Sequence, residues 1–489
     1  MSKPIVERFL AIFSSNVLGI AITFLATPII VRVLGTTRYG DYAVLLSVLS
    51  ILLLFANAGI YDGIRKHLKE SGRSQAWREH VFAFYSQVSV ILCLVFGAAI
   101  LISIQIGIVE RFLGPRFEVY FVLIVLTMFA NQAFVIARST LMGFDREDIS
   151  EKLRVADKLI FVAVGLSLLA AGFGVEGLIL GMFIANTITA TVGLAITARF
   201  VDFSRLFIWN PGEFARRRLL TFNVMSIVLF ALYVSIQHID VLLIQFFYGS
   251  TLTGYYKAAL TLAEFVWFVP RIVQIALLHS TSELWSQGKQ EEITNISSKV
   301  TRYSLLFTIL LVIGLSALAE PTVTLYYGVE FRPAVLPLII LLPGAVGFAV
   351  ARPILAIGQG KGSFRYLIYA TGIASLLNLV LNLLLIPRFG LTGAAVATSI
   401  GYFSMLVFHV ASARAIGFDP ISDLRLPKIA ITIGVASVAI FLSASIIESA
   451  LLSLVIIPPA GFVVYSAVAI ATGAISIDEL KEFRKQIPT

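Results

Sequence analysis

The chain has 489 residues, of which 58% are hydrophobic and only 13% are charged, and its mean hydropathy is +0.93. Soluble globular domains carry about 25% charged residues, so a soluble fold of this length is excluded. The net charge of +9 would fit a nucleic-acid-binding protein, and only the placement of the positive charges decides against that class.

Apolar runs long enough to cross a membrane recur along the whole chain. A helix of about 20 residues crosses the roughly 30 Å hydrocarbon layer of a bilayer. The runs without a charged side chain are 9–31, 42–61, 81–109, 119–137, 177–198, 219–237, 333–351, 366–387, 389–413 and 429–447. Shorter or charge-interrupted segments follow near 159–175, 252–278, 303–319 and 449–473. Together they predict fourteen membrane helices.

The second half of the chain repeats the first at an offset of about 215 residues. Residues 34–42, LGTTRYGDY, align with residues 248–256, YGSTLTGYY, and this register keeps two glycines and a tyrosine. Further aligned pairs are Ala137-Arg138 with Ala351-Arg352, Gly143 with Gly358, 173–177 with 389–393, and Ala198-Arg199 with Ala413-Arg414. Because the offset drifts by only two residues, the pattern indicates an internal duplication.

The duplication predicts an all-α polytopic membrane protein with two six-helix lobes around a central cavity and two appended C-terminal helices. Six is an even number, so both repeats enter the membrane from the same side and the pseudo-twofold axis lies along the membrane normal. We expect an N-terminal lobe at 1–205, a cytoplasmic interfacial linker at 206–218, a second lobe at 219–416, and the appended helices with a cytoplasmic tail at 417–489.

Prolines fall inside several predicted spans, at positions 28, 270, 343, 353, 458 and 459. Proline removes a backbone hydrogen bond and frees a carbonyl that another group must satisfy. We therefore expect an interruption at Pro28, a kink at Pro270 and a broken fourteenth span at Pro458-Pro459. The alternative is proline tolerated within an intact membrane helix.

The basic residues gather on one side of the membrane. They are few in the odd-numbered connections between spans, which all lie on the same side, and frequent at the termini and in the even-numbered connections. Of the 37 Lys and Arg residues, those in odd-numbered connections are only Arg32, Arg38, Arg111, Arg116, Arg332 and Arg388. By the positive-inside rule both termini are cytoplasmic. The run Arg216-Arg217-Arg218 follows the aromatic Trp209 and is typical of stop-transfer charge at a membrane interface. The net charge is thus a topology signal, and nucleic acid is not an expected partner.

Catalytic and cofactor-binding motifs are not found in the sequence. The single cysteine, Cys93, lies within a predicted span, so neither a disulfide framework nor a thiolate metal site is expected. The zinc-protease, phosphate-loop and nucleophile-elbow motifs are missing, and the connections between spans are short. We therefore predict no cofactor, no metal and no catalytic residue, and expect transport driven by a gradient or by consumption of the product.

Ionisable side chains inside predicted spans are the clearest functional candidates, because each costs several kcal/mol unless it faces water or a partner. Lys257, Glu264 and Arg271 follow one another at intervals of seven in the eighth span. At 3.6 residues per turn they share one helical face, about 10.5 Å apart. That spacing is too long for direct pairing, so the stripe is expected to face a wet cavity or charges on the neighbouring helix.

The seventh span contributes His238 and Asp240, about two turns from its outer end. Asp240 fits either an ion pair with Lys257 or the binding of a coupling cation. His238 is expected to be a hydrogen-bonded core histidine more often than a proton relay. With Glu264, these are the possible ion-coupling residues.

Two arginines, Arg138 and Arg352, are equivalent by the repeat and lie near the inner ends of their helices. A planar guanidinium presents paired donors, so the pair is suited to grip a phosphate or pyrophosphate. The alternative for either residue is snorkelling to the lipid headgroups. Asn131 and Gln132 lie one to two turns before Arg138 and are candidates to line the same path.

Residues 32–42, RVLGTTRYGDY, resemble the R-x-L-G-x-x-x-[FY]-G-x-Y signature of polysaccharide flippases of the Wzx group. This group belongs to the superfamily that also holds MATE exporters and MurJ lipid II flippases. The second repeat resembles the family's pattern of an Asp followed by a G-x-x-x-x-G-Y-Y turn. The positions that carry the resemblance are Arg32, Gly35, Gly40 and Tyr42, then Asp240, Gly249, Gly254 and Tyr256. Leu252 stands where a counterpart of Arg38 would be, so a symmetric role for Arg38 is not expected.

The resemblance implies a flippase that moves a lipid-linked oligosaccharide or sugar from the cytoplasmic to the outer leaflet by alternating access. The implied lipid carrier is undecaprenyl or dolichyl phosphate or pyrophosphate. The implied role of the flippase is in surface polysaccharide or glycoprotein assembly. The resemblance assigns Arg138, Arg352, Lys257 and Arg271 to a cationic central cavity. The alternatives are a MATE-like cation-coupled drug or metabolite antiporter and a membrane glycan polymerase or ligase.

The implied setting is the plasma or inner membrane of a prokaryote. The expected partners are the polyprenyl-linked glycan, membrane lipids and glycan assembly enzymes. A monomer is the expected state, because the predicted cavity lies within one chain.

Overall fold

The computed structural model describes residues 3–207, 219, 224–479 and 481, and these residues form helices and no strand. Trp209 and the run Arg216-Arg217-Arg218 lie outside the described residues, as does the predicted linker from residue 208 onward. The prediction of an all-α membrane protein is confirmed.

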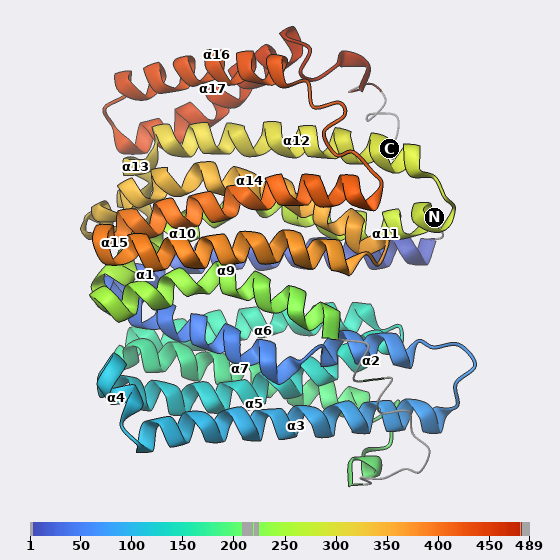
Figure 1. Cartoon of the computed structure of the whole chain (residues 1–489). Coiled ribbons are helices and arrows are strands. Elements are labelled where there is room, and N and C mark those ends of the chain that lie inside the picture. The colour runs from blue at the N-terminus through green and yellow to red at the C-terminus, as the bar shows by residue number, and fades with distance from the viewer. Residues whose placement is uncertain (1–2, 208–218, 220–223, 480, 482–489) are drawn as a thin grey trace. The chain divides into compact units, whose positions relative to one another are not determined.

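The chain divides into two compact units, residues 1–254 and 255–489. The first unit contains α1 (Lys3–Asn57), α2 (Ile60–Leu68), α3 (Gln75–Gln105), α4 (Ile108–Leu113), α5 (Arg116–Gly143), α6 (Glu147–Leu168), the π-helical turn η1 (Leu169–Phe173), α7 (Gly174–Thr197), the 3-10 turn η2 (Phe203–Phe207) and α9 (Val224–Tyr248). Helices α3 and α5 run side by side, as do α6 and α7 (Figure 1).

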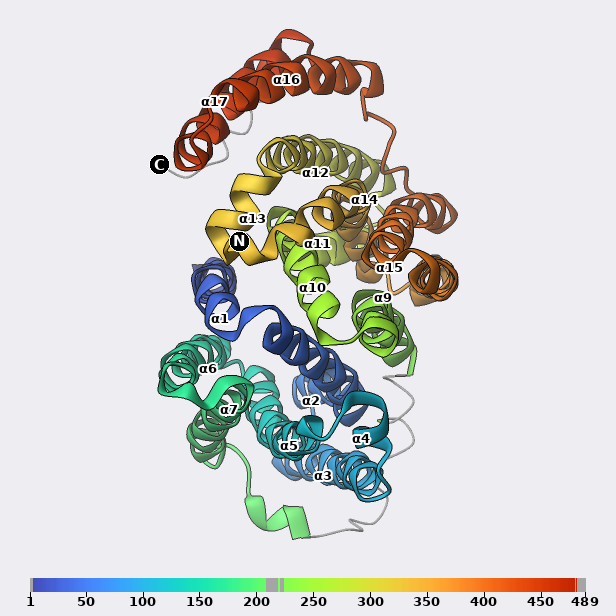
Figure 2. The same cartoon turned by 90° about the vertical axis from the view of Figure 1, so that its left-hand side faces the viewer.

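The boundary between the units falls inside α10 (Ser250–Phe265). The second unit continues with α11 (Phe268–Ser286), α12 (Gln290–Ala317), α13 (Ala319–Tyr327), the 3-10 turn η3 (Val329–Ala334), α14 (Val335–Gly360), α15 (Phe364–Ile416), α16 (Leu426–Ile446) and α17 (Ala450–Ala471). Helices α14 and α15 pack extensively, and the hairpin of α16 and α17 lies next to α12 (Figure 2).

Helix α9 belongs to the first compact unit, although the sequence repeat assigns residues 219–416 to the second lobe. A compact unit is defined by packing and a repeat by ancestry, so the two divisions describe different properties. The lobe boundaries therefore stay a prediction.

Equivalent glycines of the two repeats have the same backbone conformation. Gly174 has φ 57° and ψ −132°, and Gly390 has φ 55° and ψ −130°. Gly114 and Gly328 both end short helices with positive φ, at 97° and 112°. These left-handed conformations are open to glycine and disfavoured for residues with a Cβ. The duplication seen in the sequence thus recurs in local backbone geometry.

Ten helices or helix pairs among the described residues are long and apolar enough to cross a membrane, and the bent pair α10–α11 is an eleventh candidate. Three of the ten, at Asn16–Leu68, Glu147–Thr197 and Phe364–Ile416, exceed 50 residues. Each is broken near its middle by a glycine with positive φ, at Gly35, Gly172–Gly174 and Gly390. Counting each of these three as two crossings gives the fourteen predicted spans.

Glycines, and not prolines, mark these breaks. Helix α1 runs through Pro28 and turns at Gly35, and α17 runs without interruption through Pro458 and Pro459. The predicted breaks at these prolines are wrong, because a membrane helix that loses one backbone hydrogen bond keeps all the others in a medium that offers no alternative partner. Pro270 lies in the first turn of α11, just after the 54° bend between α10 and α11.

A cluster of charges holds the C-terminal hairpin to α12. The guanidinium of Arg302 on α12 is fully buried and donates to the Asp423 carboxylate and, at 2.6 Å, to Glu479 Oε1. Arg425 donates to the same two acids, at 3.0 Å and 2.9 Å. We call Arg302, Asp423, Arg425 and Glu479 the charge clasp. It connects α12 with the segments that precede α16 and follow α17.

The clasp keeps Glu479 ionised. Burial alone would raise the pKa of this carboxyl, but the backbone amide of Ser476 and the Arg302 guanidinium bond its charged form and hold the pKa at about 2. Its folded-state pKa is therefore below the unfolded value of about 4.3. The stability it contributes is fully present above about pH 4.3 and is lost as the pH falls toward 2.

We predict that Arg302→Met lowers the free energy of unfolding by about 1–3 kcal/mol, because within the clasp it leaves Arg425 as the single cation for two partly buried carboxylates. Thermal unfolding in detergent and trypsin cleavage near Arg425 measure the effect. Arg365→Met, at an exposed cation of α15, is the control. Equal melting of both variants would contradict a stabilising clasp.

Candidate functional site

Arg138 lies in a charged network inside the first unit. Its Nε donates to the carbonyl oxygen of Ser150 at 3.2 Å and its Nη2 to Glu151 Oε1 at 3.1 Å. Glu151 is 5% exposed and also accepts from Arg154 Nε at 2.8 Å. Arg154 in turn donates to Asn16 Oδ1 on α1 at 2.9 Å. One buried carboxylate therefore joins two arginines, and α5, α6 and α1 meet at this point.

A second polar network joins α5, α6 and α7 and centres on Asp157. Its Oδ1 accepts from Asn186 Nδ2 at 3.1 Å and from Thr189 at 3.2 Å. Asn131 Nδ2 donates to Asn186 Oδ1 at 2.6 Å, so the predicted path residue is part of this network. The charge of Arg138 also acts on Asp157. Asn131 is thus connected through Asn186 to a carboxylate that the sequence analysis did not identify, and the role of Asn131 and Arg138 in lining a substrate path stays a prediction.

Asp157 was missed because the predicted fifth span began at residue 159. The charged residues before it were counted as a connection, whereas α6 begins at Glu147 and is helical throughout this stretch. The available signal was the spacing of Arg154 and Asp157, three residues apart on one helical face.

Gln132, the other predicted path residue, contacts a different helix: it is 3% exposed and its Oε1 accepts from Ser89 on α3.

Arg352 has different surroundings, although it is the repeat equivalent of Arg138. It lies on α14, is 7% exposed, and donates from Nη1 to the amide oxygen of Gln274 at 3.1 Å. Its guanidinium carbon is 5.2 Å from the Trp267 ring centroid and 5.0 Å from that of Phe348. These aromatic faces attract the cation and fix its plane. The two arginines therefore share a position in the repeat but not an environment.

The predicted stripe of three charges on the eighth span is corrected in two respects. Lys257 and Glu264 do pair, with Nζ 3.8 Å from Oε2, because both long side chains extend along the helix and bridge the two turns. Arg271 lies on α11, beyond the bend that separates it from α10, so the three do not form one continuous face. Arg271 is exposed on the second unit.

The two candidates on α9 are held in the first unit. His238 Nδ1 lies 3.1 Å from Ser47 Oγ on α1, which agrees with a hydrogen-bonded histidine. Asp240 is fully buried, and its Oδ1 accepts from the backbone amide of Val241 at 2.8 Å. The role of Asp240 in cation binding stays a prediction.

The two signature segments of the repeat contact each other within the first unit. A Cβ added to Gly40 would lie 1.8 Å from the carbonyl oxygen of Ser250, and one added to Gly254 would lie 2.0 Å from that of Thr36. Thr37 Oγ1 is 2.8 Å from Thr251 Oγ1. With the repeat offset of 214, Thr37 and Thr251 are equivalent positions. The contact of Gly40 with Ser250 is likewise equivalent to the contact of Gly254 with Thr36, with the two repeats exchanged. We call this pairing of residues 34–42 with residues 248–254 the signature contact.

The signature contact is reinforced by a buried carboxylate. Asp41 is fully buried, and its Oδ1 accepts from Arg116 Nη2 at 2.9 Å. The same nitrogen donates to Ser250 Oγ at 3.1 Å, and Gln245 Nε2 donates to that hydroxyl at 3.2 Å. The sequence placed Gly40 and Gly254 in a family motif without a physical reason. The structure supplies one: only glycine allows the two backbones to approach this closely.

The remaining motif positions have separate roles. Gly35 bends α1 at φ 68°, and Gly249, with φ 78°, separates α9 from α10. Tyr42 is buried near Met182 in the first unit, and Tyr256 is fully buried with its hydroxyl donating to Thr398 Oγ1 at 3.0 Å in the second. Arg32 is exposed on α1.

The model of one protein family matches residues 5–268, more than half of the chain, and its description is "polysaccharide biosynthesis protein". The chain belongs to this family. Membership agrees with the resemblance to the Wzx group, and the apolar spans make the chain a multi-pass membrane protein.

Relatives and solved structures agree with this assignment. The chain is 25% identical over 404 residues, 81% of each chain, to the probable low-salt glycan biosynthesis flippase Agl15 of Haloferax volcanii. Its fold matches the lipid II flippase MurJ in an inward closed conformation with a TM-score of 0.76 at 14% identity, covering 95% of this chain and 98% of that one. An inward-facing multidrug resistance MATE transporter of the MOP superfamily matches with a TM-score of 0.63 at 16% identity, covering 82% and 98%.

We predict that Gly40→Ala opens the signature contact, because the added methyl group overlaps the Ser250 carbonyl oxygen. In a Cys93→Ala background, Thr37→Cys and Thr251→Cys should crosslink on oxidation, and adding Gly40→Ala should slow this crosslinking several-fold. Gly314→Ala is the control, since a Cβ there meets no atom within 4 Å. Unchanged crosslinking with Gly40→Ala would contradict the close approach.

Proposed function

We propose that this polysaccharide biosynthesis protein is a flippase for a polyprenyl-linked saccharide, moving it from the cytoplasmic to the outer leaflet by alternating access. The observation that carries the proposal is the match to a glycan biosynthesis flippase over 81% of both chains. The family description, polysaccharide biosynthesis protein, and the similarity of the fold to that of the lipid II flippase MurJ support it. The cargo would be an oligosaccharide or sugar on an undecaprenyl or dolichyl phosphate or pyrophosphate.

The phosphate of the cargo would be bound by Arg138 and Arg352. Both arginines lie inside apolar helices, where burying a charge without a partner costs free energy. Ionisable residues at such positions therefore usually have a partner or a function. Arg352 contacts a neutral amide and two aromatic rings in the second unit, and its positive charge would attract the phosphate anion. Arg138 shares Glu151 with Arg154, so its charge is only partly neutralised.

We place the protein in the plasma or inner membrane of a prokaryote, as the family resemblance implies. Both termini would lie in the cytoplasm, because the basic residues gather in the even-numbered connections. Lys257 and Arg271 would add positive potential near the path of the cargo. Asp240, His238 and Glu264 would be the positions at which a coupling ion acts.

We predict that replacing Arg138 and Arg352 together by Ala abolishes surface glycan export without loss of folded protein. Folding is expected to survive because Glu151 keeps Arg154 and Gln274 is neutral. Export is measured by the leaflet of the lipid-linked glycan, using an impermeant labelling reagent in cells with the native gene deleted. Lys at both positions should retain partial export if point charge suffices. Normal export by the double Ala variant would overturn the phosphate role.

A second prediction tests alternating access. If residues 34–42 and 248–254 separate once in each transport cycle, the Thr37→Cys and Thr251→Cys crosslink should stop export, and reduction of the disulfide should restore it. The single cysteine variants under the same oxidant are the controls. Export that continues at full rate in the crosslinked protein would contradict opening at this contact. Drug efflux without any change in lipid-linked glycan would favour an antiporter.

A further inference from the structure

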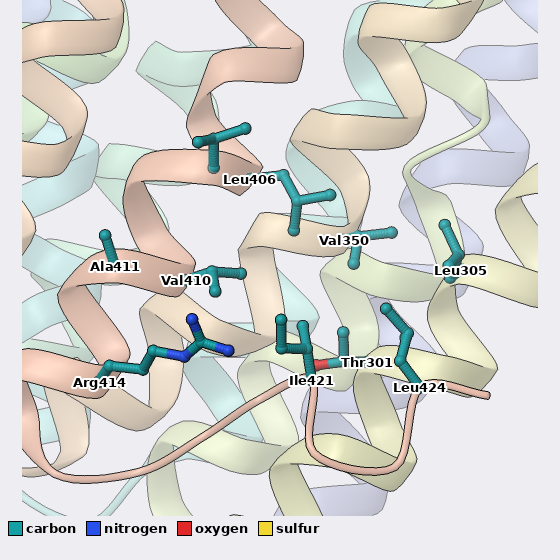
Figure 3. A pocket seen from close by; sticks show the side chains of 10 residues that line it. Thr301, Leu305, Val350, Leu406, Val410, Ala411, Arg414, Ile421 and Leu424 are labelled. Atoms are coloured by element: carbon teal, nitrogen blue, oxygen red, sulfur yellow. The ribbon is translucent and has the colours of Figure 1, made fainter. Parts of the chain in front are cut away.

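A groove opens on the surface of the second unit, between α12, α14, the end of α15 and the connection 417–425. Its volume is about 430 Å³, and eight of the ten residues that line it are apolar (Figure 3). The floor is formed by Val350, which is fully buried, and the rim by Val407, which is 53% exposed. The groove therefore runs from the surface of a membrane-spanning helix into the packed interior of the unit.

Two side chains in the groove are polar, Arg414 and Thr301. The arginine is suited to bind an anionic group, and the threonine hydroxyl is suited to bond another oxygen atom of the same ligand. Arg414 lies in the last turn of α15 and is 55% exposed, with its Nε 3.4 Å from Asp419 Oδ1. Figure 3 shows its guanidinium extending from α15 toward Ile421. One carboxylate at this distance leaves the other guanidinium donors able to bind a ligand.

Thr301 supplies the second polar group. It is 1% exposed and lines the groove from α12, and its Oγ1 has no hydrogen-bond partner among the described residues. A buried hydroxyl without a partner is unfavourable, so such groups usually bond to water or to a ligand. Its position indicates that the ligand brings an oxygen into an otherwise apolar groove.

The direction of the groove fits a lipid that enters from a headgroup layer. Arg414 lies at the end of the candidate span Phe364–Ile416, at the level expected for phosphates. Leu406 lines the groove eight residues earlier on α15, about 12 Å further into the hydrocarbon at 1.5 Å per residue. An acyl chain that follows α15 from Arg414 to Leu406 would therefore run parallel to those of the surrounding bilayer.

We propose that this groove binds one anionic glycerophospholipid, with its phosphate on Arg414, a glycerol-linked oxygen on Thr301, and one hydrocarbon chain along α15. A single arginine that shares its charge with Asp419 suits the single charge of a phosphodiester better than a pyrophosphate. The apolar lining of the groove suits a hydrocarbon chain better than a hydrophilic glycan. The bound lipid would join α12, α15 and the connection that carries the charge clasp.

The test is native mass spectrometry of the full-length protein with phosphatidylglycerol or with phosphatidylcholine of the same chains. The natural protein should retain one phosphatidylglycerol molecule at detergent concentrations that remove phosphatidylcholine. Ala411→Trp, which fills the groove, should abolish this retention. Ala415→Trp, at an exposed residue one turn further along α15 that does not line the groove, should leave it unchanged.

Charge and hydroxyl variants separate the two polar contacts. Arg414→Gln should reduce phosphatidylglycerol retention at least tenfold, whereas Arg365→Gln, the same charge change at the other end of α15, should not. Thr301→Val should cause a smaller loss for both lipids. Equal retention in Ala411→Trp and Ala415→Trp would overturn the proposal. So would displacement of phosphatidylglycerol by an equal amount of undecaprenyl phosphate, which would assign the groove to the polyprenyl lipid.

Discussion

The requirement that every backbone polar group be satisfied within the hydrocarbon layer governs this structure. No water is available there to bond a free amide or carbonyl, so the described chain is helical and leaves its helices only at specific residues. The turns that separate successive crossings in α1, α6–α7 and α15 all use glycine with positive φ, because that conformation reverses the chain within a few residues. Every other feature of the fold is built on helices placed in this way.

The same medium determines how charges are retained. Glu151 joins Arg138 and Arg154, and Asp157 is held by an amide and a hydroxyl. Arg302 is fully buried, yet two carboxylates compensate it. Such networks cost free energy to bury, and a substitution that leaves a buried charge with no partner is strongly destabilising. Among the described residues, Glu151 and Arg302 thus lie in networks of opposite charges, whereas Arg352 bonds a neutral amide and packs against two aromatic rings.

The duplication produced two copies of a backbone and different chemistry on each. Gly174 and Gly390 kept nearly identical dihedral angles, whereas Arg138 and Arg352 acquired an acidic and an aromatic environment, respectively. At the signature contact the two copies meet, and Thr37 faces Thr251 across the pseudo-symmetry of the repeat. Backbone geometry is preserved because the left-handed turns accept only glycine at low cost, while side chains between helices were free to diverge.

The sequence by itself determined the class of protein, the membrane spans, the duplication and the family, because hydropathy, period and motif are local properties of the chain. It also identified Asn131 and Arg138 as neighbours on one helix. Only the tertiary structure decided that Lys257 pairs with Glu264, that Asp157 completes the network of Asn131, and that α17 passes intact through two prolines. These outcomes depend on the reach of side chains and on packing between distant helices. The groove at Arg414 likewise exists only because α12, α14 and α15 leave a space between them, which no periodicity along a single helix encodes.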